Sequence, residues 1–158
     1  MSAVMSLEKV LPCGSVLLGV GVPDKAQLIS RAARQLAVMT GASAEALESA
    51  LLAREALGST GVGSGIALPH ARLHILGGTH AVFLRLATPI SFDSVDDKPV
   101  DLVCAIVAPD EPSAALLTAV SAISRTLRDA AKTTALRGTS NAADVRRILL
   151  GGDGGATH

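Results

Sequence analysis

The sequence predicts an α/β fold, a single layered domain in which helices cover both faces of a mixed β-sheet. Short apolar runs bounded by glycine and proline are typical of strands, and they are interspersed with segments of helical periodicity. The chain has 158 residues, of which 49% are hydrophobic. This is the size of one domain and enough apolar material for a continuous core. Strands and helices mixed in so short a chain are expected to pack as layers.

The first elements expected along the chain are a strand and a helix. Residues 16–20 form a short apolar run that contains β-branched residues and is bounded by glycine and proline, as is typical of a strand. After Lys25, apolar residues recur every three or four positions, which predicts a helix that stops at Gly41. The apolar stripe of this helix consists of Leu28, Ile29, Ala32, Ala33, Leu36 and Ala37.

A second helix is predicted to begin after Ser43 and to end at Gly58. Serine is a preferred N-cap residue, and glycine commonly follows the last helical turn. The stripe of this helix consists of Leu47, Ala50, Leu51 and Arg54. Arg54 is therefore expected in the last turn. The Gly-rich segment that follows, 59–69, is expected to be a loop that leads into a short strand at its apolar end.

Two longer strands are predicted in the middle of the chain. The runs 81–87 and 100–107 are apolar, and the polar segment 96–99 between them has the composition of a turn. Both runs have the length of strands rather than of helices.

The last part of the chain is predicted to be helical. Apolar residues with helical spacing occur over 117–127 and again over 145–149, where Ser140 is the expected N-cap. The Gly-rich segment 151–158 is expected to be a disordered tail. The domain is therefore expected to span residues 1–150.

The composition disfavours several classes of function. Lys and Arg together number 14, as do Asp and Glu, and aromatic residues make up 1% of the chain, so nucleic acid is an unexpected partner. The uncharged stretch 10–23 is interrupted by glycine and proline and is too short to insert into a membrane. Before it, Lys9 stands beside Glu8, which does not resemble an export signal. Cys13 and Cys104 form no CxxC pair, which favours the reducing cytoplasm.

The residues that carry chemistry lie together in the segment 54–72. This segment combines a Gly-rich loop, hydroxyl side chains, two arginines and a histidine. Backbone N–H groups at glycines, hydroxyls and the planar guanidinium fork all suit a phosphate group. Because a histidine with an ordinary pKa near 6.5 is largely neutral in the cytoplasm, His70 can attack phosphorus without a separate base.

On the residues alone, other functions stay open beside a phosphohistidine site. The glycines match neither nucleotide-binding fingerprint, because 61–63 does not continue to GxGxxG and no Gly-Lys-Ser/Thr follows. Nucleotide binding is therefore disfavoured. A metal site at His70, His74 and His80 would lack interleaved carboxylates and a standard zinc spacing. We expect no metal site.

The segment resembles the active-site signature of a known family. The run Arg-Glu-x-x-Gly-Ser-Thr-Gly-x-Gly-x-Gly-Ile-Ala-x-Pro-His-x-Arg is similar to that of enzyme IIA domains of the fructose/mannitol/nitrogen-regulatory type, from the bacterial sugar phosphotransferase system. Further similarity lies in 88–93, in 97–103 and at Ala108-Pro109. The resemblance covers roughly residues 7–149 and implies the same α/β fold.

The resemblance also implies residue roles. His70 matches the histidine that accepts the phosphoryl group from a histidine-containing phosphocarrier protein, and Arg54 matches the arginine that neutralises phosphate charge. Residues that match the surroundings of that histidine, and are expected to bind phosphate, are Ser59, Thr60, Gly61, Gly63 and Arg72. The implied reaction needs no metal and no other cofactor.

One position departs from the family pattern. Many members carry a second histidine near the start of the helix that follows the Ala-Pro strand end, and Leu116 is the best match here. A leucine donates no hydrogen bond to phosphate. Leu116→His is therefore expected to speed phosphoryl transfer. Two alternatives compete with this view: Leu116 is a core residue, or His74 takes over the role.

The resemblance leaves more than one destination for the phosphoryl group. A sugar-transport component passes it to a IIB domain, whereas a nitrogen-type protein uses its phosphorylation state to regulate target proteins. The sequence of residues 58–70 is more similar to the nitrogen-type branch, which favours a regulator. A partner-binding module that transfers no phosphate is the alternative from another class, and it would tolerate the loss of Arg54. A metal-dependent enzyme ranks last.

Overall fold

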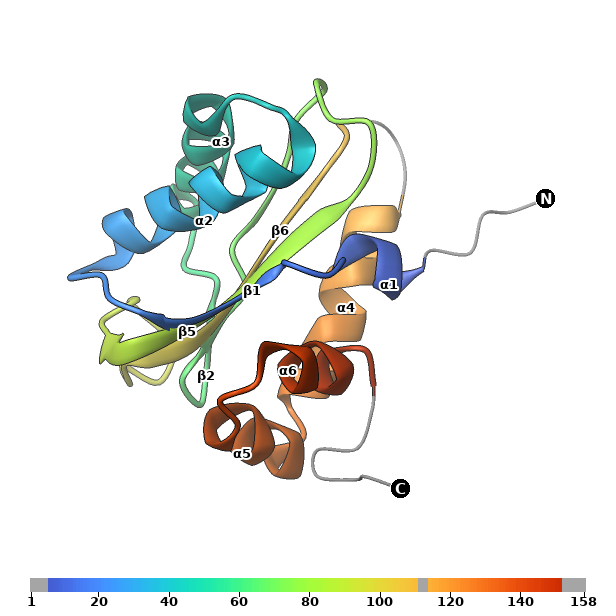
Figure 1. Ribbon diagram of the computed structural model, residues 1–158. Helices are drawn as coiled ribbons and strands as arrows, with labels where there is room; N and C mark the ends of the chain where they lie inside the picture. The colour runs from blue at the N-terminus through green and yellow to red at the C-terminus, as the bar shows by residue number, and fades with distance from the viewer. Residues whose placement is uncertain (1–5, 111–113, 152–158) are drawn as a thin grey trace.

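The computed structural model describes residues 6–110 and 114–151, and it shows a β-sheet with helices on both faces (Figure 1). The helices are α1 (Leu7–Val10), α2 (Lys25–Thr40), α3 (Ala44–Ala56), α4 (Ala115–Leu127), α5 (Ala130–Gly138) and α6 (Ala142–Leu149). The strands are β1 (Val16–Val20), β2 (Gly61–Gly63), β3 (Ile66–Ala67), β4 (His70–Arg72), β5 (His80–Ile90) and β6 (Val100–Ala108). No helix in these two ranges is long and apolar enough to cross a membrane.

The strands form one mixed sheet in the order β1-β5-β6-β3-β2, and β4 also pairs with β6. The long strands β5 and β6 are antiparallel neighbours, and β1 runs parallel to β5. The short strands β3 and β4 follow one another along β6, parallel to it, with Ile66 opposite Leu102 and His70 opposite Ile106. The predicted fold class is confirmed.

The strand predictions agree with the structure. The first strand has the predicted bounds, and the runs 81–87 and 100–107 lie within β5 and β6. The pairing of β1 with β5 is irregular between Leu17 and Val20, where Gly19 has a φ of 66°. A positive φ is a conformation that glycine adopts without a steric penalty.

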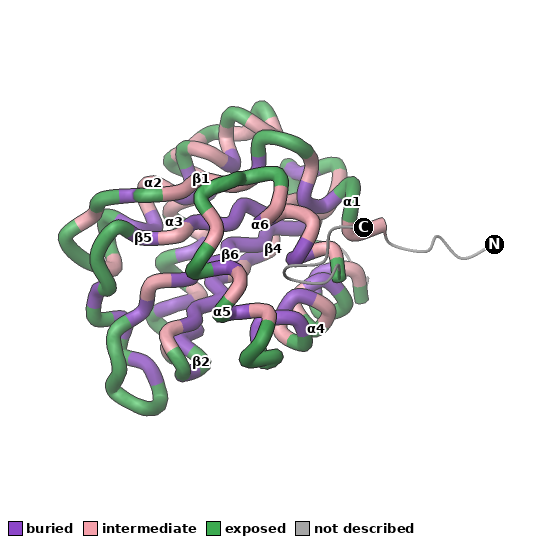
Figure 2. Tube along the Cα trace, turned by 60° about the horizontal axis from the view of Figure 1, so that its bottom comes forward, coloured by how far each residue is buried: buried purple, intermediate pink, exposed green. Residues whose placement is uncertain are grey.

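Buried residues form one cluster on each face of the sheet. Figure 2 shows buried positions along the strands and on the helices that cover them. Because neighbouring strand residues point to opposite faces, β5 supplies Val82 and Leu84 to one layer and Phe83 to the other. The first layer packs against α2 and α3 through Leu28, Leu36, Leu47 and Leu51. The second packs against α4, α5 and α6 through Leu116, Ile123, Leu136 and Ile148.

The predicted ends of α2 and α3 are confirmed by their caps. Gly41 follows α2 with a left-handed φ of 78°. The hydroxyl of Ser43 accepts a hydrogen bond from the backbone N–H of Ala46 at the start of α3. Arg54 lies in the last turn of α3, as expected.

The structure differs from the sequence-based expectations in several places. The segment expected as a loop contains β2, and His70 lies in a strand of its own, β4. The helix α5 was not expected, because its short sequence includes two threonines and its N-cap, Asp129, lies outside any apolar stripe. The cap of α6 is Asn141 rather than Ser140, since the Asn141 side chain accepts from two N–H groups of the first turn. The predicted tail, apart from Gly151, lies outside the described residues.

Candidate functional site

Arg54 lies where α3 ends and the Gly-rich segment begins. Its guanidinium donates a hydrogen bond to the backbone carbonyl of Gly58 at 2.9 Å, and the residue is half-buried. This contact uses one of the five N–H donors of the guanidinium. Arg54 is thus held at the start of the loop, and its other guanidinium N–H groups can donate to a ligand.

The neighbouring residue, Glu55, ties α3 to the same loop. The residue as a whole is only 7% exposed. The carboxylate accepts hydrogen bonds from the backbone N–H of Thr60 at 3.1 Å and from the Thr60 hydroxyl at 2.5 Å. It also pairs with Lys25 at 2.9 Å. A buried carboxylate is stable only when it is paired in this way.

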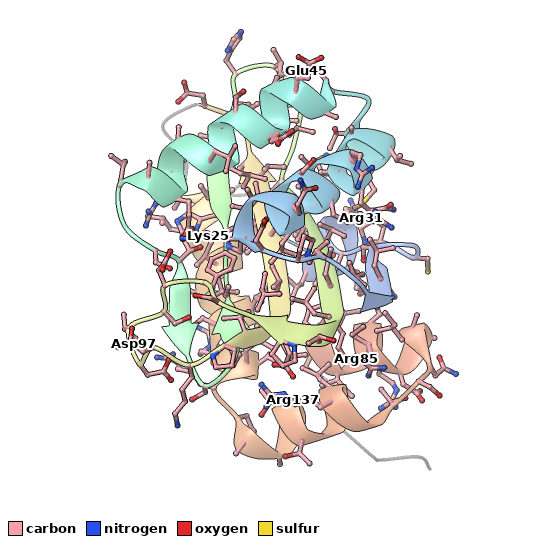
Figure 3. All side chains as sticks on the ribbon, turned by 90° about the vertical axis from the view of Figure 1, so that its left-hand side faces the viewer. Lys25, Arg31, Glu45, Arg85, Asp97 and Arg137 are labelled. Carbon is pink, nitrogen blue, oxygen red and sulfur yellow. The ribbon has the colours of Figure 1, made fainter. Side chains whose placement is uncertain are left out.

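The charges in this cluster support one another. Burial alone would raise the pKa of Glu55, but hydrogen bonds from Thr60, Lys25 and Ser59 outweigh it and hold the pKa below its ordinary value of 4.5. Burial lowers the pKa of Lys25, but the contacts with Glu55 and Asp93 outweigh it and raise the pKa above 10.5. The Lys25 ammonium lies 3.2 Å from Asp93 and 4.9 Å from the centre of the Phe92 ring. Figure 3 shows Lys25 on the α2 and α3 side of the sheet. Both charged forms therefore persist through the neutral range.

Sequence reasoning missed Glu55 as a functional residue. A signal for it was present, because Glu55 follows Leu47 and Leu51 at four-residue spacing on the buried stripe of α3. A charged residue on an apolar stripe requires a buried partner.

The hydroxyls of Ser59 and Thr60 make hydrogen bonds within the protein. Ser59 donates to the carbonyl of Phe92 at 2.7 Å and accepts from the N–H of Gly61 at 3.0 Å. Thr60 is 5% exposed, and its hydroxyl donates to Glu55. Both side chains therefore hold the shape of the loop. A phosphate contact of either hydroxyl stays a prediction.

The loop glycines are required by the local geometry. A Cβ atom at Gly61 would lie 2.3 Å from the hydroxyl oxygen of Ser94, so no side chain fits there without a shift of Ser94. Gly63 begins a turn with φ of 97°, and Ser64 and Gly65 follow with φ of 58° and 82°. The N–H of Ser64 donates to the carboxylate of Asp96 at 2.9 Å, which holds this turn.

His70 is half-buried in β4, next to the central strand β6. Its Nδ1 atom lies 2.8 Å from the carbonyl oxygen of Leu68. Because a carbonyl can only accept, this hydrogen bond requires the proton on Nδ1 and leaves a lone pair on Nε2. Since Ala71 packs in the layer with α2 and α3, His70 emerges on the opposite, α4 side of the sheet.

A chain of hydrogen bonds connects Glu55 to His70. Glu55 holds Thr60, and the carbonyl of Thr60 accepts from the N–H of Leu68 at 3.0 Å. The carbonyl of Leu68 in turn accepts from His70. The end of α3 therefore helps to set the position of the imidazole through two loop residues.

Arg72 lies two residues beyond His70 in β4, so the two side chains leave the same face of the strand. Its guanidinium approaches the carbonyl of Pro109 at 3.5 Å. A cation thus lies near His70, and its contact with phosphate stays a prediction.

Leu116 lies in the first turn of α4 and is 3% exposed. It packs in the same layer as Leu68 and Ile106, so the alternative that Leu116 is a core residue agrees with the structure. Faster transfer in Leu116→His stays an untested expectation, and burial of the position argues against it.

His74 and His80 are the other histidines in the described part of the chain. His74 is exposed, and burial lowers the pKa of His80. Among residues 6–110 and 114–151, no three His, Cys, Asp or Glu side chains gather where they could hold a metal ion.

His70 and Arg54 have the chemistry that transfer of a phosphoryl group needs. In the described part of the chain His70 bonds Leu68 and Arg54 bonds Gly58, so their joint action on one phosphate stays a prediction. An imidazole with a free Nε2 lone pair can form a bond to phosphorus, and an arginine with uncommitted donors can neutralise the oxygens. In such reactions the protein contributes mainly position and electrostatics.

Comparisons with known proteins identify the family of the chain. Residues 9–151 match the family model described as "Phosphoenolpyruvate-dependent sugar phosphotransferase system, EIIA 2". The chain is 38% identical over 135 residues to the "Nitrogen regulatory protein" of Bradyrhizobium diazoefficiens, covering 85% of this chain and 88% of the relative. It is 37% identical to the protein of the same name from Klebsiella oxytoca, over 75% and 71% of the two chains.

The structure of the chain is also similar to solved structures. The crystal structure of the nitrogen regulatory protein IIA-Ntr from Neisseria meningitidis has a TM-score of 0.87 at 31% identity, covering 90% of this chain and 98% of that one. The mannitol IIA of Escherichia coli shares the fold, with a TM-score of 0.74 at 24% identity and coverage of 88% and 98%. The resemblance seen in the sequence is thereby confirmed, and the chain belongs to the EIIA 2 family of the phosphoenolpyruvate-dependent sugar phosphotransferase system.

Proposed function

We propose that the protein is a phosphocarrier of the nitrogen-regulatory type and accepts a phosphoryl group on Nε2 of His70. Family membership supports a role in phosphoryl transfer. The observation that carries the assignment to this atom is the hydrogen bond from Nδ1 of His70 to the carbonyl of Leu68. It keeps the proton on Nδ1, so Nε2 needs no base to become a nucleophile.

In the proposed step the lone pair of Nε2 forms the new nitrogen–phosphorus bond while the corresponding bond in the donor breaks. The donor is a histidine-containing phosphocarrier protein, and neither metal nor nucleotide takes part. As the His70 ring gains positive charge, the Leu68 carbonyl stabilises the Nδ1–H. Arg54 neutralises the equatorial oxygens, and Arg72 adds a second cation.

The other loop residues are proposed to bind phosphate mainly by keeping backbone N–H groups in place. Gly61 and Gly63 keep the backbone free of side chains, and Ser59 and Thr60 fix the path of the chain. Helix α4 begins on the same side of the sheet as His70 but contributes the apolar Leu116 there.

The relatives favour a regulatory destination over sugar transport. Two relatives at 37–38% identity carry the name "Nitrogen regulatory protein". We therefore propose that the phosphorylation state of His70 controls binding to target proteins in the cytoplasm. Transfer to a IIB domain is the alternative.

Phosphorylation by a purified phosphoenolpyruvate-dependent donor system, followed by mass mapping, tests the proposal. We expect one label, at His70, formed equally well with a metal chelator present during the final transfer from the purified phosphodonor. His70→Ala should remove it. A label on His74, His80 or His158, or one that survives the substitution, would contradict the assignment. Absence of any label on the wild-type protein would favour a partner-binding module.

A further inference from the structure

A pocket of about 610 Å³ lies between the β2–β3 turn, the end of α4 and the helix α5. It is on the α4 side of the sheet, where Figure 3 shows Arg137 reaching from α5 toward the strands. Small-molecule sites in proteins have volumes of roughly 300–1,000 Å³. The pocket is therefore large enough for a metabolite.

The floor of the pocket is apolar. It is formed by Ile66, Leu68 and Leu127, whose side chains belong to the core layer on this side. Around it stand the hydroxyl residues Ser124 and Thr134. An apolar floor below a few polar groups is the usual composition of a site for an organic molecule.

Two arginines lie at the rim of the pocket, and they differ in their hydrogen-bond partners. Arg137 is fixed, because it makes a bidentate pair with Asp101 at 2.9 Å and donates to the carbonyl of Ser64. Arg128, the C-cap residue of α4, is exposed, and its guanidinium has no hydrogen-bond or ion-pair partner within the described ranges. Arg128 therefore offers a charge that a ligand can use.

Among the residues that the structure describes, no carboxylate lines the pocket to neutralise this charge. Asp101 is committed to Arg137, and Asp129 turns its carboxylate onto the N–H groups of Ala131 and Lys132 at the start of α5. With Arg137 offset by Asp101, the net charge at the rim comes from Arg128.

We propose that this pocket binds a small organic anion, with its negative group at Arg128 and its apolar body on the floor. A carboxylate, sulfonate or phosphate group matches the guanidinium fork. Inorganic phosphate would gain nothing from the apolar floor and should bind much more weakly. The floor residue Leu68 also holds His70 through its carbonyl, so the ligand would lie beside the support of the histidine without touching it. The proposal does not depend on phosphorylation of His70.

Titration with the fluorescent probe anilinonaphthalenesulfonate tests the pocket directly. We expect saturable binding to the wild-type protein and a loss of affinity of about tenfold or more in Arg128→Gln, as for one charge-assisted hydrogen bond. Arg125→Gln is the matched control, because Arg125 lies on the same helix, is exposed and bonds Ser121 instead. Amide NMR shifts on binding should centre on Val62, Leu68 and Thr134.

Several results would overturn the proposal. Equal probe affinity in the Arg128→Gln and Arg125→Gln proteins would remove Arg128 from the site. Shift changes that centre on the exposed Leu57 and Val38 instead would show that the probe binds another surface. Displacement of the probe by equimolar inorganic phosphate would show that the apolar floor plays no part. Because none of these measurements uses a phosphodonor, a failure of His70 to accept phosphate would leave them unchanged.

Discussion

The carboxylate of Glu55 accepts hydrogen bonds from both the backbone N–H and the hydroxyl of Thr60, at 3.1 and 2.5 Å. Thr60 is bonded to Leu68, and Leu68 to His70, so a residue on α3 supports the proposed phosphoacceptor from a distance. Glu55 is a positioning residue in this arrangement, since among the described residues it is connected to the imidazole only through Thr60 and Leu68.

We expect Glu55→Gln to fold and to slow phosphoryl acceptance by roughly 10- to 100-fold, the range seen when residues that orient metal-bound histidines are removed. The imidazole ¹⁵N shifts of His70 should change at the same time, because its tautomer and orientation become less fixed. Rapid-quench labelling and NMR measure the two effects.

The matched control is Asp93→Asn. Asp93 is the other, exposed carboxylate beside Lys25, and the hydrogen bonds that Thr60 donates go to Glu55 instead. Its loss should leave both readouts close to the wild type. If Glu55→Gln lowers the melting temperature but leaves the rate and the His70 spectrum unchanged, Glu55 is structural only.

The pKa of Glu55 predicts a dependence of stability on pH. A carboxylate whose pKa is lowered on folding stabilises the native state above its unfolded pKa, and the stabilisation is lost as the pH falls through the folded value. For Glu55 this loss begins below an ordinary value of 4.5. Denaturant unfolding at pH 7 and at pH 3 should therefore show a smaller difference between the wild type and Glu55→Gln in acid. An equal difference at both pH values would exclude the ionised carboxylate as the cause.

Lys25 predicts a loss of stability at high pH instead. Its pKa is raised above 10.5, so its stabilising pairs persist below that value and are lost as the pH rises through the folded pKa.

Arg54→Ala should accept phosphate about 100-fold more slowly, the typical loss when one preorganised electrostatic donor is removed from a transition state. Its effect on the free energy of unfolding should be small, about 1 kcal/mol or less, because only one hydrogen bond to Gly58 is lost. Single-turnover labelling beside a thermal melt separates the two effects. Arg34→Ala, at an exposed position of α2, is the control for loss of charge. Wild-type kinetics in Arg54→Ala would favour the module that transfers no phosphate.

Leu116→His should destabilise the protein rather than speed transfer. The substitution replaces a buried leucine with a polar ring that has no partner in the core, at a cost of about 2–4 kcal/mol. Leu117→His on the same helix, at a position 61% exposed, should be nearly neutral. Thermal melts of the two variants make the comparison. A stable Leu116→His protein with faster labelling would restore the view that a helping histidine fits here.

The parts of the fold that could be predicted are those specified by local pattern. The stripe of α2, the Ser43 cap and the runs of β5 and β6 each lie within a single continuous segment. Helix α5 escaped prediction because its cap, rather than an apolar stripe, defines its start. The register that places His70 beside Ile106 is non-local, and spacing along the chain does not encode it.

In the candidate site, too, only some features could be predicted from the sequence. The residue types in 54–72 pointed to His70 and Arg54, because their chemistry can be read from the sequence. The hydrogen bonds of Ser59 and Thr60 could not be predicted, since their partners include Phe92, more than thirty residues away. The link from Thr60 to Leu68 likewise depends on a turn with three successive positive φ values.

The irregular pairing at Gly19 in β1 has a consequence for how separate molecules meet. β1 is one border of the sheet, and a flat border strand can recruit a strand from another molecule and so start aggregation. The positive φ of Gly19 interrupts the row of backbone donors and acceptors after only a few residues. At the other border, β2 has three residues, two of them glycine. The borders at β1 and β2 are therefore poor templates for intermolecular strand addition.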